Sequence, residues 1–308
     1  QRYDDITKIF KNIYDHHSNI KIYATGSSSL EIKNLIQESL AGRKIITHLY
    51  PLCFEEYLIF KQRPELIDKI KNLNTIKLTK NYFKLIPEIK PYFEDFLIWG
   101  GYPEVALVKQ KDKIEVLQSI FDLFVKKDLK DFVKPEKLNA ASMFIKLLAI
   151  NNGCITNYQN MATKTQLDNK TIKNYLEILK ETFLINIIPP YYSNKTKELT
   201  KTPKIYFIDN GICNYFCNNF NEINLRNNAG LLFEGYILSE MLKNGIKSEN
   251  IKYYRTKYKT EIDFILEKNQ KLVPIEIKYK TKIDANDSKT LTTFLDTYQI
   301  TKAYLINL

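Results

Sequence analysis

The chain of 308 residues is poor in glycine, with only nine, and it contains a single tryptophan. It has no G-x-x-x-x-G-K-[ST] run, so the loop and lysine with which P-loop enzymes hold nucleotide phosphates are absent. The longest mostly apolar runs, Phe144–Ile150 and Phe183–Ile188, are too short to cross a bilayer. The first thirty residues contain no apolar block of the signal-peptide kind. We therefore expect a cytoplasmic protein with no membrane partner.

Cysteine is also scarce, and none of the four cysteines belongs to a C-x-x-C pair. The three histidines are remote from most of them in sequence, which argues against a zinc site. We expect four buried free thiols in a reducing compartment. They are Cys53, Cys154, Cys213 and Cys217.

Positive charge is abundant, with a formal net charge of +11 and a pI of about 9.2. Such a balance favours nucleic acid or another polyanion as the partner. A general enrichment in Lys, Asn, Ile and Tyr would produce the same charge without any such role. Both explanations stay open at this point.

The N-terminal region alternates predicted strands and helices. An amphipathic helix is expected over Gln1–Asp15, and strands over Ile20–Thr25 and Ile45–Leu49. Between the strands, a serine-rich turn leads into a helix from about residue 30 to 40. Ser28 and Glu31 have the spacing of a capping box, which explains the serines structurally.

Three motifs in this region, TGSS, L-A-G-R and Y-P-L-x-F-x-E-Y, occur in that order. They resemble the late part of the ATPase core in AAA-type prokaryotic ATP-binding proteins, which have a helical and nuclease-like C-terminal half. The resemblance implies that Thr25 or Ser27 senses the terminal phosphate, and that Arg43 stabilises charge during phosphoryl transfer. Without a P-loop the chain is expected to be a fragment or a natural remnant, with ATP bound only by an intact protein. Relatives of this type often form rings, so a homo-oligomer is possible.

The middle of the chain predicts helices. A helix is expected to end at Gly100-Gly101 and the next to begin at Pro103, within a W-G-G-Y-P-E string that the same family carries. We interpret this string as a packed corner rather than a catalytic element. A long helix is expected over Lys113–Phe132. The following helix–helix–helix–strand–loop–strand order, from 136 to 208, is that of a winged helix with a flexible basic wing.

In a winged helix the third helix lies in the major groove of DNA. On this basis Thr171, Lys173, Asn174 and Lys180 of that helix are predicted to face DNA. Lys195, Lys197 and Lys201 of the wing are predicted to contact backbone phosphates. The alternative is that the winged helix only packs against other protein.

The last hundred residues contain the acidic candidate site. A helix over Ala229–Lys243 precedes three predicted strands, followed by a helix at about residues 288–298 and a final strand at 302–306. Glu-Ile-Lys occurs three times in this chain, but only Glu276–Lys278 lies in an apolar strand, where alternation puts both charged side chains on one face. The order of elements resembles the PD-(D/E)xK nuclease fold.

That resemblance implies Glu234, Asp263, Glu276 and Lys278 as catalytic residues, with the three acids as ligands of Mg²⁺ or Mn²⁺. Phosphodiester cleavage uses such ions to polarise the phosphate and to lower the pKa of water, and a lysine can orient that water or neutralise the phosphate. Clustered acids without a cation are costly, which also favours a metal. The alternative is a degenerate nuclease fold used for docking.

The sequence therefore predicts a multi-domain α/β protein. Its expected parts are a remnant of an ATPase core over 1–60, a helical region over 61–135, a winged helix over 136–208 and a nuclease-like α/β domain over 209–308. The expected function is metal-dependent action on nucleic acid, and the alternative is a non-catalytic module that binds DNA or a partner under the control of ATP.

Overall fold

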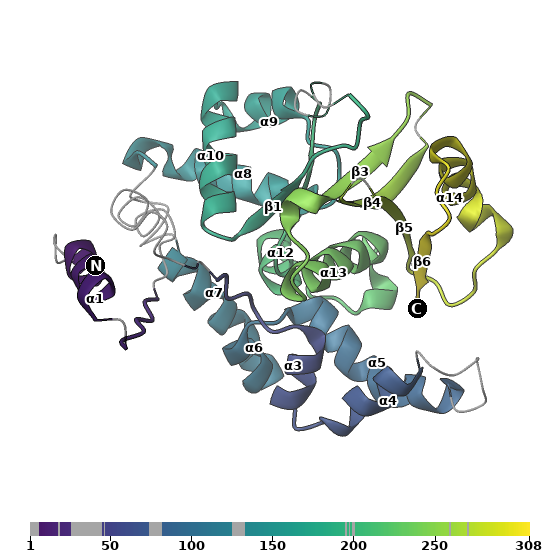
Figure 1. Cartoon of the computed structure of the whole chain (residues 1–308), viewed down its shortest axis with the longest axis horizontal. Helices are drawn as coiled ribbons and strands as arrows, with labels where there is room; N and C mark the ends of the chain where they lie inside the picture. Colours follow the sequence, from purple (N-terminus) through teal and green to yellow (C-terminus); the bar gives the residue numbers. More distant parts are fainter. Residues whose placement is uncertain are drawn as a thin grey trace.

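A computed structural model describes residues 6–17, 19–25, 45, 47–73, 82–124, 133–194, 196, 198, 201–258, 260–269 and 271–308. It is a mixed α/β chain with two small sheets (Figure 1). The α-helices are α1 (Ile6–His16), α3 (Phe54–Phe60), α4 (Glu65–Leu73), α5 (Tyr82–Trp99), α6 (Pro103–Leu107), α7 (Lys113–Phe124), α8 (Leu138–Ile150), α9 (Tyr158–Thr165), α10 (Asn169–Glu181), α12 (Asn210–Cys217), α13 (Ala229–Lys243) and α14 (Ala285–Tyr298). The strands are β1 (Ile185–Ile188), β2 (Lys204–Phe207), β3 (Ile251–Arg255), β4 (Glu261–Lys268), β5 (Lys271–Lys278) and β6 (Tyr304–Asn307).

The C-terminal sheet has the order β3-β4-β5-β6, with β5 and β6 parallel and the other pairs antiparallel. Helices α13 and α14 pack against it through two separate apolar clusters. The alternation of β5 explains this, because Ile275 and Ile277 join the cluster of α13 while Leu272 joins that of α14. The predicted helix, three strands, helix and strand are all present, with α13 and β3 at the expected bounds.

The N-terminal neighbour of this sheet is a bundle of α8, α9 and α10 with the antiparallel pair β1–β2. Ile155 adds a single antiparallel bridge to Lys204 of β2. Asp168 caps the N-terminus of helix α10, where its carboxylate accepts from the Thr171 amide at 2.8 Å. The expected order of three helices and two strands is confirmed.

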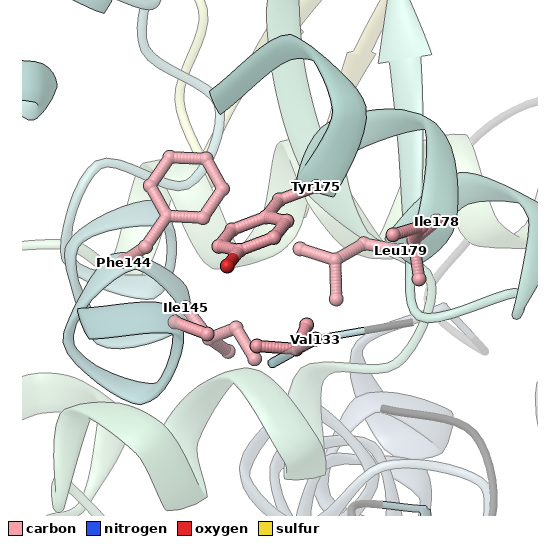
Figure 2. A pocket seen from close by; sticks show the side chains of 7 residues that line it. Val133, Phe144, Ile145, Tyr175, Ile178 and Leu179 are labelled. Atoms are coloured by element: carbon pink, nitrogen blue, oxygen red, sulfur yellow. The ribbon is translucent and has the colours of Figure 1, made fainter. Parts of the chain in front are cut away.

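The interior of this bundle is well packed. A cavity of only about 10 Å³ lies between α8 and α10, lined by apolar side chains and Tyr175 (Figure 2). It is at the lower limit for one water molecule and offers few polar partners. It therefore belongs to the core and is no ligand site.

The corner at Trp99-Gly100-Gly101 connects α5 to α6 and packs against Asp209, two residues after the end of β2. Gly100 has φ +75°, and the amide of Gly101 donates to the buried carboxylate of Asp209 at 2.7 Å. The same carboxylate accepts from the amides of Gly211 and Ile212 at the start of α12. Burial raises the pKa of Asp209, although Lys243 and these amides oppose the rise. The structural interpretation of the W-G-G-Y-P-E string is consistent with this packing.

The segment between β1 and β2 differs from the flexible wing that was expected. Its described residues dock on β3: the amide of Tyr253 donates to Pro189, and the Tyr191 amide donates to Tyr253. Lys252 of β3 also reaches Glu198 at 2.5 Å. The unpaired backbone groups of the edge strand β3 bind this segment. The sequence showed only that the segment is polar, so its docking could not be predicted from the sequence alone.

The two N-terminal strands are not formed. Residues 20–25 lie outside any helix or strand, and so do the described residues of Ile45–Leu49, with Ile45 and Leu49 almost fully exposed. A strand needs a neighbour for its amides and carbonyls, and the part of the chain that the structure describes offers none here. Thr25 is exposed, whereas Ser27 and Arg43 lie outside the described residues.

One apolar cluster runs from Leu97 in α5 to Leu232 in α13, so it includes parts of three of the four predicted domains. All four cysteines are free thiols, but only Cys213 is buried and Cys154 is exposed, which corrects the expected burial. No helix among the described residues is long and apolar enough to span a membrane.

Candidate functional site

The candidate site lies where β4 and β5 separate. Their paired residues run from Lys268↔Lys271 to Phe264↔Ile275 and stop there. Beyond that point the amide of Ile277 donates to the Asp263 carboxylate at 2.7 Å. The carboxylate of Asp263 thus replaces a backbone carbonyl as the partner of this amide.

Glu276 and Lys278 lie on β5 beside this opening. The Lys278 ammonium donates to Oε1 of Glu276, and Lys278 is partly exposed. Oε2 of Glu276 is buried and has no hydrogen-bond partner within the structure. An unpaired buried carboxylate oxygen is costly, so this atom is suited to accept from a ligand or to bind a cation.

Glu234 reaches the site from α13 and is 7% exposed. It accepts from Lys204 at 3.0 Å and from the hydroxyl of Tyr206, and both of these residues lie on β2. Lys204 is 3% exposed and also contacts Glu261 at 2.5 Å. A lysine from the neighbouring bundle is therefore the internal counter-ion of the acidic cluster.

Lys204, Tyr206 and Glu261 were not predicted as site residues. The sequence holds one local indication of their role. Side chains alternate along β2, so Lys204 and Tyr206 lie on the side opposite Ile205 and Phe207. A buried lysine requires an acidic partner. Which acid it meets depends on contacts 30 and 57 residues away in sequence.

The acids of the cluster repel one another. The pKa of Asp263 is raised to about 8. Burial is the largest cause and the charges of Glu234 and Glu276 contribute, whereas Lys204 opposes the rise. Burial also raises the pKa of Glu276, although Lys278 opposes it. Burial alone would lower the pKa of Lys204, but Glu234 and Glu261 raise it above its ordinary value. The three predicted acids therefore share one electrostatic environment.

The raised pKa of Asp263 predicts the pH dependence of stability in the absence of divalent cations. The folded state holds this proton more tightly than the unfolded state, whose aspartate pKa is about 3.9. Stability should therefore fall as pH rises from about 4 to 8. We expect Asp263→Asn to stabilise the protein at pH 9 by on the order of 2 kcal/mol in urea unfolding with EDTA. A variant with the wild-type pH profile would contradict this assignment.

The donor set agrees in part with the predicted metal. Asp263 and the unpaired Oε2 of Glu276 are the hard oxygen ligands that Mg²⁺ or Mn²⁺ prefers, and magnesium commonly uses one or two carboxylates and keeps several waters. Among the described residues, however, no three His, Cys, Asp or Glu side chains form a group that could hold a metal ion. Glu234 is bound by Lys204 and Tyr206 instead, so its role as a third ligand stays a prediction.

Of the predicted nucleic-acid contacts that the structure describes, all but Thr171 are exposed. Lys173 and Asn174 are exposed on α10, and Lys201 is exposed before β2. Lys195 and Lys197 lie outside the described residues. Lys173 lines an open groove with Arg255 of β3, which brings the bundle and the C-terminal sheet together at one surface.

Three family models match successive parts of the chain. Residues 1–58 match a model described as an AAA domain, residues 90–223 match a domain of unknown function (DUF8612), and residues 229–308 match a second one (DUF4143). No solved structure matches.

Among curated relatives, an uncharacterized protein of Methanocaldococcus jannaschii is 28% identical over 89% of this chain and 59% of its own length. One from Haemophilus influenzae is 23% identical over 91% of this chain and 64% of its own length. The chain thus spans about three fifths of the length of these relatives. Together with the AAA-domain match, they support an ATPase-like family of the AAA type.

Proposed function

We propose that the C-terminal part of this chain is a metal-dependent phosphodiesterase that acts on nucleic acid. The observation that carries the proposal is the buried, unpaired Oε2 of Glu276 beside Asp263, at the point where β4 and β5 separate. A second support is the Lys278 ammonium on the other oxygen of Glu276. Two carboxylates and a lysine at one strand opening are the groups that phosphodiester cleavage requires.

Each residue has a distinct role in this proposal. Asp263 and Glu276 would hold a divalent ion, which supplies polarisation of the phosphate and activation of water. Asp263 is oriented by the Ile277 amide. Lys278 is partly exposed, so its ammonium can reach a phosphate oxygen and stabilise the charge that develops there. Glu234 holds Lys204 and Tyr206, and through them the neighbouring bundle.

Cleavage tests this proposal directly. We expect the protein with Mg²⁺ or Mn²⁺ to cut DNA or RNA, and we expect Asp263→Ala and Lys278→Ala to reduce the rate by at least about a hundredfold. Lys280→Ala is the matched control, because Lys280 lies two residues farther along and pairs with Asp284 and Asp287 rather than with Glu276. Cleavage that persists in both variants would come from a contaminant and would contradict the proposal.

A second candidate function is a non-catalytic module that binds nucleic acid or a partner protein. The specific observation in its favour is Lys204, whose ammonium pairs with both Glu234 and Glu261 without any metal. A divalent cation should then leave the melting temperature unchanged. Under the first proposal, Mg²⁺ or Mn²⁺ raises it, and Asp263→Asn removes the rise.

The AAA-type similarity at residues 1–58 adds a role for nucleotide. We propose that an intact protein with a phosphate-binding loop binds ATP, and that Thr25 or Ser27 and Arg43 contribute to that site. In the chain as it stands, binding of ATP should be weak, because its sequence has no phosphate-binding loop.

A further inference from the structure

An open groove of about 750 Å³ lies between the helical bundle and the C-terminal sheet. One wall comes from the start of α9 and from α10, and the other from Arg255 at the end of β3; these elements lie on the same side of the molecule (Figure 1). Two cations, Lys173 and Arg255, line it, and none of the lining residues that the structure describes is acidic. Acidic residues lie close to it: Glu261 pairs with Arg255 at 3.2 Å, Glu177 lies on the next turn of α10, and Asp168 caps this helix directly before Asn169.

On both walls, residues that line the groove contact residues next to the acidic site. Ile155, which lines it, forms a β-bridge with Lys204, and the amide of Thr156 donates to Pro203 at 3.1 Å. On the other wall, Arg255 contacts Glu261, which in turn contacts Lys204. A ligand that fills the groove therefore lies next to the side chains that surround Glu234.

We propose that this groove binds a single strand of nucleic acid and leads it to the acidic site; the proposal rests on the phosphodiesterase function above. The two cations suit backbone phosphates. Between them, Asn157, Gln159 and Asn169 offer amides that both donate and accept, and Tyr158 offers an aromatic ring. Amides match base edges and an aromatic ring allows stacking, whereas a purely acidic peptide would use only the cations. Amides and an aromatic ring can pair with base edges and stack on bases only where those bases are unpaired, as in a single strand, whereas the bases of a duplex are already paired and stacked.

Binding of a labelled thymidine oligonucleotide to the full chain, measured by fluorescence anisotropy in EDTA, tests this. We expect Lys173→Gln and Arg255→Gln each to weaken binding about three- to tenfold, and to reduce the slope of log K against log salt by about 0.7. Lys180→Gln removes the same charge from α10 but lies outside the lining of the groove, so it should change affinity less than about twofold. Melting temperatures establish that all three variants fold.

The assignment would be overturned by equal losses in all three variants, by the absence of wild-type binding at low salt, by tighter binding of a duplex of the same length, or by equal competition from polyglutamate. Asp263→Asn separates this proposal from the one on which it rests, because it should abolish cleavage and leave strand binding unchanged. Strand binding through Lys173 and Arg255 without cleavage would contradict only the phosphodiesterase function. Cleavage with unchanged binding in both groove variants would contradict only the groove.

Discussion

Lys204→Met is expected to lower the free energy of unfolding by about 3–5 kcal/mol, because it removes one partner of a buried ion pair and leaves Glu234 without its ammonium. Tyr206 still donates to Glu234, but a neutral hydroxyl cannot offset the charge. Since the pKa of Lys204 is raised, its charge and its contribution are present throughout the range below about pH 10. Urea unfolding at pH 7 in EDTA is the measurement.

Two further variants make this result specific. The double variant Lys204→Met/Glu234→Gln should recover much of the loss, because no uncompensated charge then remains.

Lys252→Met is the matched control: Lys252 is also buried and contacts two acids, Glu198 and Glu267, but away from the candidate site. Lys204→Met and Lys252→Met should both lower the free energy of unfolding. Mg²⁺ should restore more of it in Lys204→Met than in Lys252→Met, because the ion can also replace the ammonium lost beside Glu234. A loss below about 1 kcal/mol, the range of an exposed ion pair, would contradict the counter-ion role.

Gly100→Ala is expected to cost at least about 4 kcal/mol or to prevent folding. Its φ of +75° costs a residue with a side chain roughly 1–2 kcal/mol. In addition, the new Cβ would overlap the carboxylate of Asp209, which must then move away from the amides of Gly101 and Gly211. Each buried amide that loses its partner adds about 1–3 kcal/mol.

The chain offers a close control for this substitution. Gly245 has φ +86°, and a Cβ added there meets nothing within 4 Å. Gly245→Ala therefore measures the backbone cost alone, which we expect to be about 1–2 kcal/mol. Gly211→Ala should resemble Gly100→Ala, since its Cβ would overlap the carbonyl of Trp99. Equal losses of stability for Gly100→Ala and Gly245→Ala would show that the overlap with Asp209 does not contribute.

The C-terminal elements could be predicted because their signals are local. The apolar alternation of β5 and the periodicity of α13 depend on neighbours within a few residues, and both elements form where expected. The same alternation correctly put Glu276 and Lys278 together on β5. Local patterns also placed the corner at Gly100, because glycine is the residue that a positive φ requires.

The parts that could not be predicted depend on distant partners. Ile20–Thr25 has the composition of a strand, but a strand forms only when a neighbouring strand pairs with it. The segment after β1 is polar, and only the edge of β3 explains its docking. Lys204 is one of many lysines in the sequence. Its importance follows from burial beside Glu234 and Glu261, which no periodicity reveals.

The bridge from Lys204 to Glu234 has an evolutionary consequence. The lysine belongs to the segment that matches one family model, residues 90–223, and the acid belongs to the segment that matches the next, residues 229–308. Recombination that exchanged either segment alone would bring an uncompensated charge into the interior. The two segments are therefore expected to descend together, and relatives should vary this lysine and this glutamate as a pair.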